Sequence, residues 1–251
     1  MLIQHIALVP EAEGIDPSEL ARVSAALQKQ VTRDLSPAWG VAATVDAFPR
    51  LEDAPVGYWP ILVTRELGGD SGVRLDRDGT PYAQVEHSPD WSLDASRACI
   101  EMLVNPFGKR TVSAPSPRSD QGRVEVVLEV CAPCADVLCA YAINDVVVSD
   151  FCLPAFYEEG PIAAGRRLSM NGSVGAPFRV LPGGHLTWFD VVSESFWRRS
   201  HWGENPVDAR LGKLAHAASS SRELLPHALP ARLHGSSPAH EAFHARRHPC
   251  L

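Results

Sequence analysis

The segment Ser96-Arg97-Ala98-Cys99-Ile100-Glu101 holds the residues whose types and spacing could do chemistry. Apolar residues around it recur at helical spacing, so we expect a helix on which Arg97 and Glu101, four residues apart, share one face. Arg97 is a permanent cation that only donates hydrogen bonds, so it cannot be a metal ligand. The pair can form a solvated ion pair worth roughly a few tenths of a kcal/mol. Alternatively, Arg97 can bind a carboxylate or a phosphate through its bidentate fork.

Cysteine and histidine supply the other candidate ligands. Cys131 and Cys134 have the two-residue spacing of zinc and redox motifs, and Cys139 follows, but no second pair at similar spacing completes a four-ligand zinc site. We expect half-buried thiols on a loop after a strand, with a reactive or bridged pair as the alternative. Three histidines at four-residue intervals, beginning at His240, would share one helical face and could capture zinc or nickel, although such a tail more often carries them incidentally. No metal and no cofactor is predicted.

Length and composition limit the class of protein. A chain of 251 residues can bury a full core, and 45% hydrophobic with 21% charged residues is typical of a globular domain. The net charge of −7 argues against nucleic acid or an anionic membrane surface as a partner. No apolar run reaches the roughly 20 residues that cross a bilayer, and the N-terminus lacks the basic region of a signal peptide. Six cysteines without such a signal favour reduced thiols in the cytoplasm.

Two helices are expected to position the reactive segment. The first begins at Pro17, with Asp16 as its N-cap, and its apolar spacing continues to about residue 34. The second is capped by Ser92 or Asp94 and ends at Asn105, which precedes a proline. Its buried stripe is expected to contain Ala95, Cys99, Met102 and Leu103. Strands are expected at residues 2–9, 41–48, 59–64, 124–130, 146–148 and 185–190.

The order of these elements predicts an α+β domain, with a mixed sheet and helices on one face. The composition changes near residue 205, beyond which arginine, serine, proline and histidine dominate. We therefore expect one domain over residues 1–205, followed by a tail over residues 206–251 that is mostly disordered or loosely helical and lies outside the core.

The chain resembles a family of uncharacterised bacterial zincin-like proteins that are regarded as metallopeptidases. The likeness extends over roughly residues 1–215, and several landmarks occur in the family's order. These landmarks are residues 26–34, 37–40, 81–85, Trp91, 101–106, 129–134, 148–151, 154–155, 176–178 and 181–184. The resemblance implies a zincin-like single domain in which the second helix is the former active-site helix. It implies no substrate, because none is firmly established for the family.

The motif residues of this family are largely replaced. The family's helix usually reads Ser-His-Glu-x-x-Glu-Met-Leu-x-Asp-Pro. This chain has Arg97 for the histidine, Ala98 for the first glutamate and Asn105 for the aspartate, whereas Glu101 keeps the second glutamate. A histidine that the family carries before the strand at residue 81 is Arg74 here. Zinc hydrolysis requires neutral or anionic ligands, an open coordination position and a general base, so the resemblance implies that zinc-peptidase activity is lost.

The leading hypothesis is a degenerate metallopeptidase-like protein, a pseudoenzyme that binds a small anionic ligand or a peptide carboxylate. Arg74 and Arg97 would line the former metal cleft above Glu101, with guanidinium carbons within about 10 Å, a separation that one anion can bridge. Asp150 and His185 stand at landmark positions and complete the expected ligand-binding set. Asp150 can instead be a structural carboxylate that caps backbone amides, and His185, where relatives often carry tyrosine, can be an edge residue.

Two other hypotheses belong to different classes. In the first, the protein is a metal-independent enzyme of a biosynthetic pathway, with Glu101 as the acid–base group and Arg74 and Arg97 holding an acidic substrate. In the second, it is a metal-dependent hydrolase that uses substitute ligands, namely Asp94, Glu101, Asp150 and His87.

Overall fold

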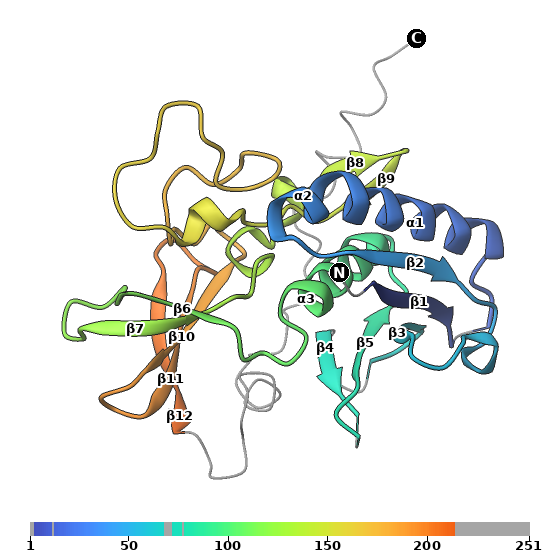
Figure 1. Ribbon diagram of the computed structural model, residues 1–251, viewed down its shortest axis with the longest axis horizontal. Coiled ribbons are helices and arrows are strands. Elements are labelled where there is room, and N and C mark those ends of the chain that lie inside the picture. Colours follow the sequence, from blue (N-terminus) through green and yellow to red (C-terminus); the bar gives the residue numbers. More distant parts are fainter. Residues whose placement is uncertain (1–2, 12, 68–71, 77, 214–251) are drawn as a thin grey trace.

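The computed structural model describes residues 3–11, 13–67, 72–76 and 78–213. Two sheets flank a central helix, with the first sheet on the right and the second on the left of Figure 1. The helices are α1 (Pro17–Gln30), a π-helical turn (Val31–Leu35), α2 (Ser36–Trp39) and α3 (Trp91–Val104). Short 3-10 turns are η2 (Leu51–Asp53), η3 (Ala132–Cys134), η4 (Val137–Cys139) and η5 (Pro154–Tyr157). No helix in the described residues has both the length and the apolar character needed to cross a bilayer.

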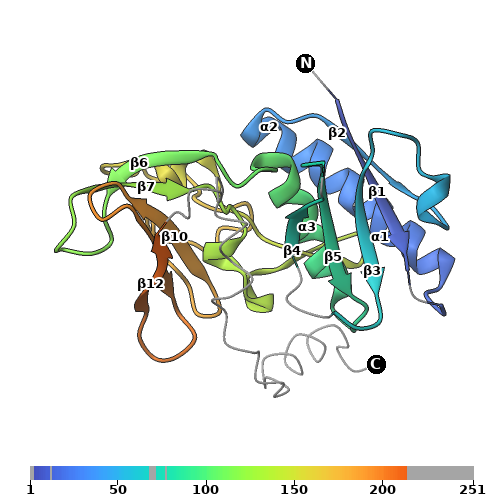
Figure 2. The same cartoon turned by 90° about the horizontal axis from the view of Figure 1, so that it is seen from below.

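The first sheet is mixed. Its strands are β1 (Gln4–Pro10), β2 (Ala43–Ala47), β3 (Trp59–Thr64), β4 (Gly72–Leu75) and β5 (Pro81–Glu86), in the order β2-β1-β3-β5-β4. All neighbouring strands are parallel except the edge strand β4, which runs antiparallel to β5. Successive side chains of β1 point to opposite faces of the sheet. Ile6 and Leu8 join the main core with residues of α1 and α3, whereas Ala7 and Val9 form a small cluster on the opposite face. Figure 2 shows the strands of this sheet beside α1 and α3.

The first helix begins as the sequence predicts. Asp16 accepts a hydrogen bond from the Ser18 amide at 2.9 Å, and Pro17 occupies the first helical position, where no amide hydrogen is needed. The helical path runs further than expected, because the π-helical turn carries it into α2. It ends at Gly40, whose φ of 65° is in the left-handed region that favours glycine.

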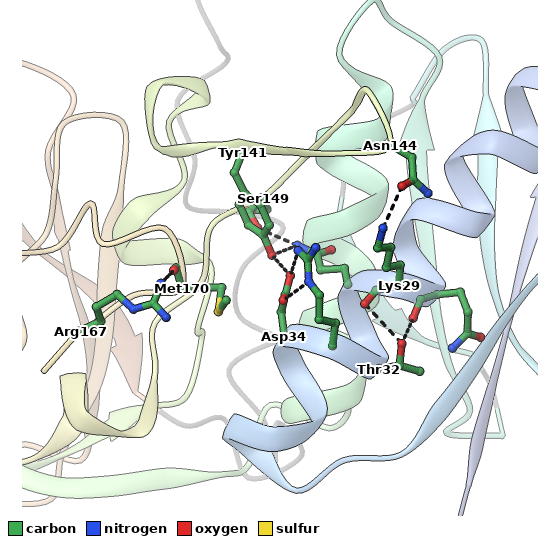
Figure 3. A network of polar contacts seen from close by, with 11 residues as sticks. Lys29, Thr32, Asp34, Tyr141, Asn144, Ser149, Arg167 and Met170 are labelled. Atoms are coloured by element: carbon green, nitrogen blue, oxygen red, sulfur yellow. Dashed lines mark hydrogen bonds and ion pairs between the residues drawn. The ribbon is translucent and has the colours of Figure 1, made fainter.

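A buried polar network connects α1 with α3 and with the hairpin of β8 (Tyr141–Ile143) and β9 (Val146–Val148). The Gln30 side chain donates to the Tyr141 hydroxyl at 3.0 Å and accepts from the Ser96 hydroxyl at 2.8 Å. The Tyr141 hydroxyl donates to Asp34 at 2.9 Å, and these two residues meet near Ser149 in Figure 3. Because Ser96 precedes Arg97, this network fixes the rotation of α3 at the reactive segment.

The helix α3 is almost wholly inside the molecule. Its predicted stripe is buried, and so are the other residues of the helix except Ser92, Asp94 and Arg97. It packs against β4 and β5 of the first sheet and against β9. The described side chains of α3 that water can reach are therefore those near Asp94 and Arg97.

The second sheet is antiparallel, in the order β12-β11-β10-β7-β6. Its strands are β6 (Thr111–Pro115), β7 (Arg123–Val127), β10 (His185–Asp190), β11 (Ser195–Ser200) and β12 (Val207–Lys213). Val126 and Trp188 from this sheet belong to the same buried cluster as Ile6 and Ile100 from the first sheet and α3. One core thus joins both sheets, and the expected α+β class is confirmed.

The predicted end of the domain at residue 205 is too early. Val207–Lys213 pairs with β11, and Arg199 holds Asp208 through two hydrogen bonds of 2.7 and 2.8 Å. This strand is hard to predict from the sequence, because the exposed edge strand β12 has a mixed polar pattern. Residues 214–251, with the three spaced histidines, lie outside the described residues.

We expect two truncations to behave differently. A chain ending at Lys213 should unfold cooperatively with a melting temperature near that of the full chain, because it keeps every described helix and strand. A chain ending at Asn205 loses β12 and the partner of Arg199, and its melting temperature should fall by at least about 5 °C, as a loss of ~2 kcal/mol produces in a domain of this size. Calorimetry on both chains checks this, and equal melting temperatures would show that β12 adds no stability.

Candidate functional site

Arg97 points from α3 towards the segment that follows β7. Its Nη1 donates to Asp94 Oδ1 at 2.7 Å, one turn earlier in the helix, and its Nη2 donates to the Ala135 carbonyl at 2.6 Å. The side chain is 20% exposed. The sequence predicted an ion pair with Glu101, whereas the ion pair of Arg97 in the structure is with Asp94.

Glu101 is directed at the same segment from the next turn of α3. Its Oε1 accepts a hydrogen bond from the Cys131 amide at 2.7 Å, and the residue is only 8% exposed. A carboxylate in this position satisfies a buried backbone amide and is shielded from substrate. We therefore correct the predicted catalytic role of Glu101 to a structural one: with Arg97 it fastens residues 131–135 to α3.

The predicted shared pocket of Arg74 and Arg97 is wrong. Arg74 stands directly opposite Tyr82 in the pairing of β4 with β5, and residues paired in this way point to the same face of a sheet. Tyr82 packs on the cluster that faces away from α3, whereas Val73, the neighbour of Arg74, packs on the main core. The sheet therefore separates Arg74 from Arg97, and one anion cannot bridge them.

Asp150 is a structural carboxylate rather than the predicted ligand-binding residue. It is 1% exposed, and Oδ1 accepts from the amides of Phe151 at 2.8 Å and Asn171 at 2.7 Å. Its Oδ2 accepts from the Ser173 hydroxyl. These bonds hold the long connection after η5 against β9, and they leave the carboxylate inside the fold.

His185 has a carboxylate partner, Glu129, that sequence reasoning missed. Its Nε2 is 3.6 Å from Glu129 Oε2, and their side chains are 21% and 12% exposed. Burial lowers the pKa of His185, and the charges of Arg198 and Arg97 lower it further against the opposing effect of Glu129. Burial alone would raise the pKa of Glu129, but the contact with His185 and the charges of His185 and Arg198 outweigh it and lower this pKa to about 2.

Two glycines bring His185 to this place. A Cβ on Gly184 would lie 2.6 Å from the Pro133 carbonyl oxygen and 2.7 Å from that of Ala132, so only glycine fits against η3. Gly183 has a φ of 79°, in the left-handed region. Residues 181–184 are a landmark of the resemblance, but nothing local in the sequence indicates that they dock on η3 and set His185 next to Glu129.

The substitute metal ligands do not come together. Asp94 pairs with Arg97, Asp150 is occupied by backbone amides, and the His87 ring lies 6.0 Å from the Trp91 ring. Across the ranges that the structure describes, no three histidine, cysteine or carboxylate side chains are grouped as metal ligands would be. The geometry therefore gives no support to the metal-dependent alternative.

The thiols are more deeply buried than the sequence predicts. Cys131 and Cys134 are 0% and 1% exposed, and they are free, as are the other described cysteines, Cys99, Cys139 and Cys152. Burial raises the pKa of Cys131, and it raises the pKa of Cys99 to about 12. Both therefore stay protonated at neutral pH, and a thiol is a poor nucleophile and metal ligand.

Asn105 has a structural role that an aspartate could not fill. Its amide nitrogen donates to the carbonyls of Arg110 and Leu128, both at 3.2 Å, and its oxygen accepts from the Arg110 amide at 3.0 Å. An ionised aspartate has no hydrogen to donate to those two carbonyls. Asn105 therefore anchors the connection from α3 to β6.

Comparisons of the chain with family models, curated proteins and solved structures find no match. The arrangement of charges around the 131–135 segment is thus the basis for any functional conclusion.

We expect Asn105→Asp to lower the free energy of unfolding by about 3 kcal/mol at pH 7, because it buries an unpaired charge against two carbonyls. Burial raises the pKa of such an aspartate above its unfolded value, so the loss should shrink as the pH falls and the carboxyl is protonated. Urea unfolding at pH 7 and pH 4.5 measures both effects.

Asn144→Asp is the matched control, since Asn144 is at a turn and its side-chain oxygen accepts a hydrogen bond from Lys29 at 3.0 Å. The control should change stability by less than about 0.5 kcal/mol. An equal effect of both variants would contradict the role of Asn105.

Proposed function

We propose that this protein is a degenerate metallopeptidase-like protein that binds a carboxylate ligand and does not hydrolyse peptides with zinc. One observation carries the proposal. At two motif positions of α3, Arg97 and Glu101 bind the backbone of residues 131–135, where a peptidase would need ligands directed at a metal.

Three features support a zincin-like architecture. The helix with the motif lies against one face of a mixed sheet, and it packs beside the antiparallel edge strand β4 and its neighbour β5. The resembled family's motif positions occur on α3 in the right order, and Arg74 is on β4. The long α1 covers the same face of the sheet as α3.

The ligand contact that fits best is Arg97 alone. Each of its terminal nitrogens makes one of the hydrogen bonds described above and carries a second N–H group. One-fifth of the side chain is exposed, and we propose that a small anion or a peptide carboxylate shares the guanidinium with Asp94 through these N–H groups. Asp94 and Glu129 oppose an anion, so we expect binding in the millimolar range, about −4 kcal/mol. The buried free thiols suit a reducing compartment, and we include a cytoplasmic location in the proposal.

The zinc part of the proposal is tested by metal analysis. Dialysed protein should contain far less than one zinc per chain, because Arg97 cannot ligate and Ala98 replaces the general base. The protein should also leave unblocked peptides intact over hours at neutral pH. One zinc per chain that survives removal of residues 214–251 and disappears in Glu101→Gln would refute the proposal.

The carboxylate part is tested by an NMR titration with N-acetyl-alanyl-alanine and its C-terminal amide. The free acid should shift resonances near Arg97, and the amide should not. Arg97→Gln should weaken binding about tenfold, the effect of losing a charged hydrogen bond of ~1.4 kcal/mol. Asp94→Asn should strengthen it, because a competing carboxylate is removed. Arg74→Gln is the matched control, since it removes the same charge on the opposite face of the sheet. Equal weakening in both arginine variants would refute a contact at Arg97.

A further inference from the structure

His185 and Glu129 form a second polar pair, and the charge of Arg97 acts on it by lowering the pKa of His185. His185 begins β10, and Glu129 follows β7, the strand that pairs with β10. The 3.6 Å between Nε2 and the carboxylate is longer than a hydrogen bond, as is common in acid–base pairs without a substrate. Oε2 of Glu129, the atom that faces His185, is buried and has no hydrogen-bond partner among the described residues. This oxygen can therefore accept a proton shared with the imidazole.

The carboxylate decides which ring nitrogen carries the hydrogen. An ionised carboxylate only accepts, so a neutral His185 must present Nε2–H to Glu129, and the lone pair is then on Nδ1. No hydrogen bond joins Nδ1 to a described residue, and the ring is one-fifth exposed. The basic nitrogen of His185 is thus the one that Glu129 does not face.

The charges around the ring keep the His185 imidazole neutral at pH 7. Glu129, Arg198 and Arg97 are the ionised groups that act on His185. Arg198 donates through Nε to the Thr187 hydroxyl at 3.3 Å, and Thr187 follows His185 by two residues on the same face of β10. With burial, the two arginines hold the pKa of His185 below its ordinary value of 6.5, so the ring is neutral at pH 7. A neutral imidazole is the form that can take a proton from a substrate or from water.

We propose that His185 is a general base, through Nδ1, for hydrolysis of small carboxylate-bearing esters, with Glu129 as the positioning residue. The imidazole takes a proton from a water molecule while the oxygen of that water forms a bond to the ester carbonyl carbon. When the bond from that carbon to the leaving oxygen breaks, the imidazolium returns the proton to the leaving alkoxide. The products are an acid and an alcohol. The proposal rests on the proposed function, because Arg97 supplies the contact for the substrate's carboxylate.

The first test examines the free protein and needs no variant to fold. With ¹⁵N-labelled imidazoles, NMR should show His185 neutral at pH 7 with its hydrogen on Nε2, and titrating below pH 6.5. Glu129→Gln should lower that midpoint further and mix the two tautomers, because the carboxylate favours both the charged ring and Nε2–H. A hydrogen on Nδ1 at pH 7, or a protonated ring, would overturn the proposal.

The second test follows hydrolysis of 4-acetoxybenzoate, with its methyl ester as the uncharged control. The rate above buffer should fall at least tenfold in His185→Gln and remain unchanged in His5→Gln, which alters a histidine on the far face of the first sheet. The rate should rise with pH through the His185 midpoint, and Glu129→Gln should shift that midpoint. Arg97→Gln should raise KM for the carboxylate ester and leave KM for the methyl ester unaffected.

An unchanged rate in His185→Gln overturns this inference alone if the dipeptide carboxylate still binds at Arg97. If the dipeptide fails to bind, the proposed function fails with it.

Discussion

The attachment of residues 131–135 to α3 is the constraint on which the rest of the site depends. Glu101 satisfies the Cys131 amide at one end of this segment, and Arg97 satisfies the Ala135 carbonyl at the other. The segment in turn provides the surface against which Gly184 docks with no room for a side chain. Through these contacts one helix of the first sheet's layer sets the position of β10 in the second sheet. These polar contacts and the apolar packing around them hold the two sheets in the same arrangement, and the sheets therefore share one core.

The positive charge of Arg97 explains why the contacts of α3 with residues 131–135 are incompatible with a zinc centre at this position. A zinc site keeps a coordination position open and directs neutral or anionic ligands into it. Arg97 fills the equivalent position with a cation that cannot lose its proton, and a partly buried cation requires a partner. Asp94 supplies that partner one turn away at 2.7 Å, so the local charge is balanced without an ion. Arg97 and Glu101 thereby act as links between α3 and residues 131–135.

Local rules predicted much of the fold and little of the site. The cap at Asp16 and the buried stripe of α3 follow from contacts within a few residues, so the sequence predicts them well. The edge strand β12 was missed because its polar residues show no clear alternation. The position of Arg74 was misjudged because the face of a strand residue depends on its register with a partner, which here only the pairing with Tyr82 reveals. Glu129 was missed because its role requires β7 and β10 to be adjacent, although residues 129 and 185 are far apart in sequence.

The partner of each carboxylate, more than its residue type, distinguishes the structural carboxylates from Glu129. Asp150 and Glu101 are chemically suited to acid–base work, but one oxygen of each accepts from backbone amides inside the core. Glu129 is also shielded, yet its Oε2 faces an imidazole that solvent can reach, so its charge acts on a proton at the surface of the site. The difference between Glu101 and Glu129 is therefore the group that each carboxylate faces, a backbone amide next to α3 and an imidazole at the start of β10. The proposed acid–base pair depends on the adjacency of β7 and β10, and the contacts of α3 with residues 131–135 help to hold β10 in place.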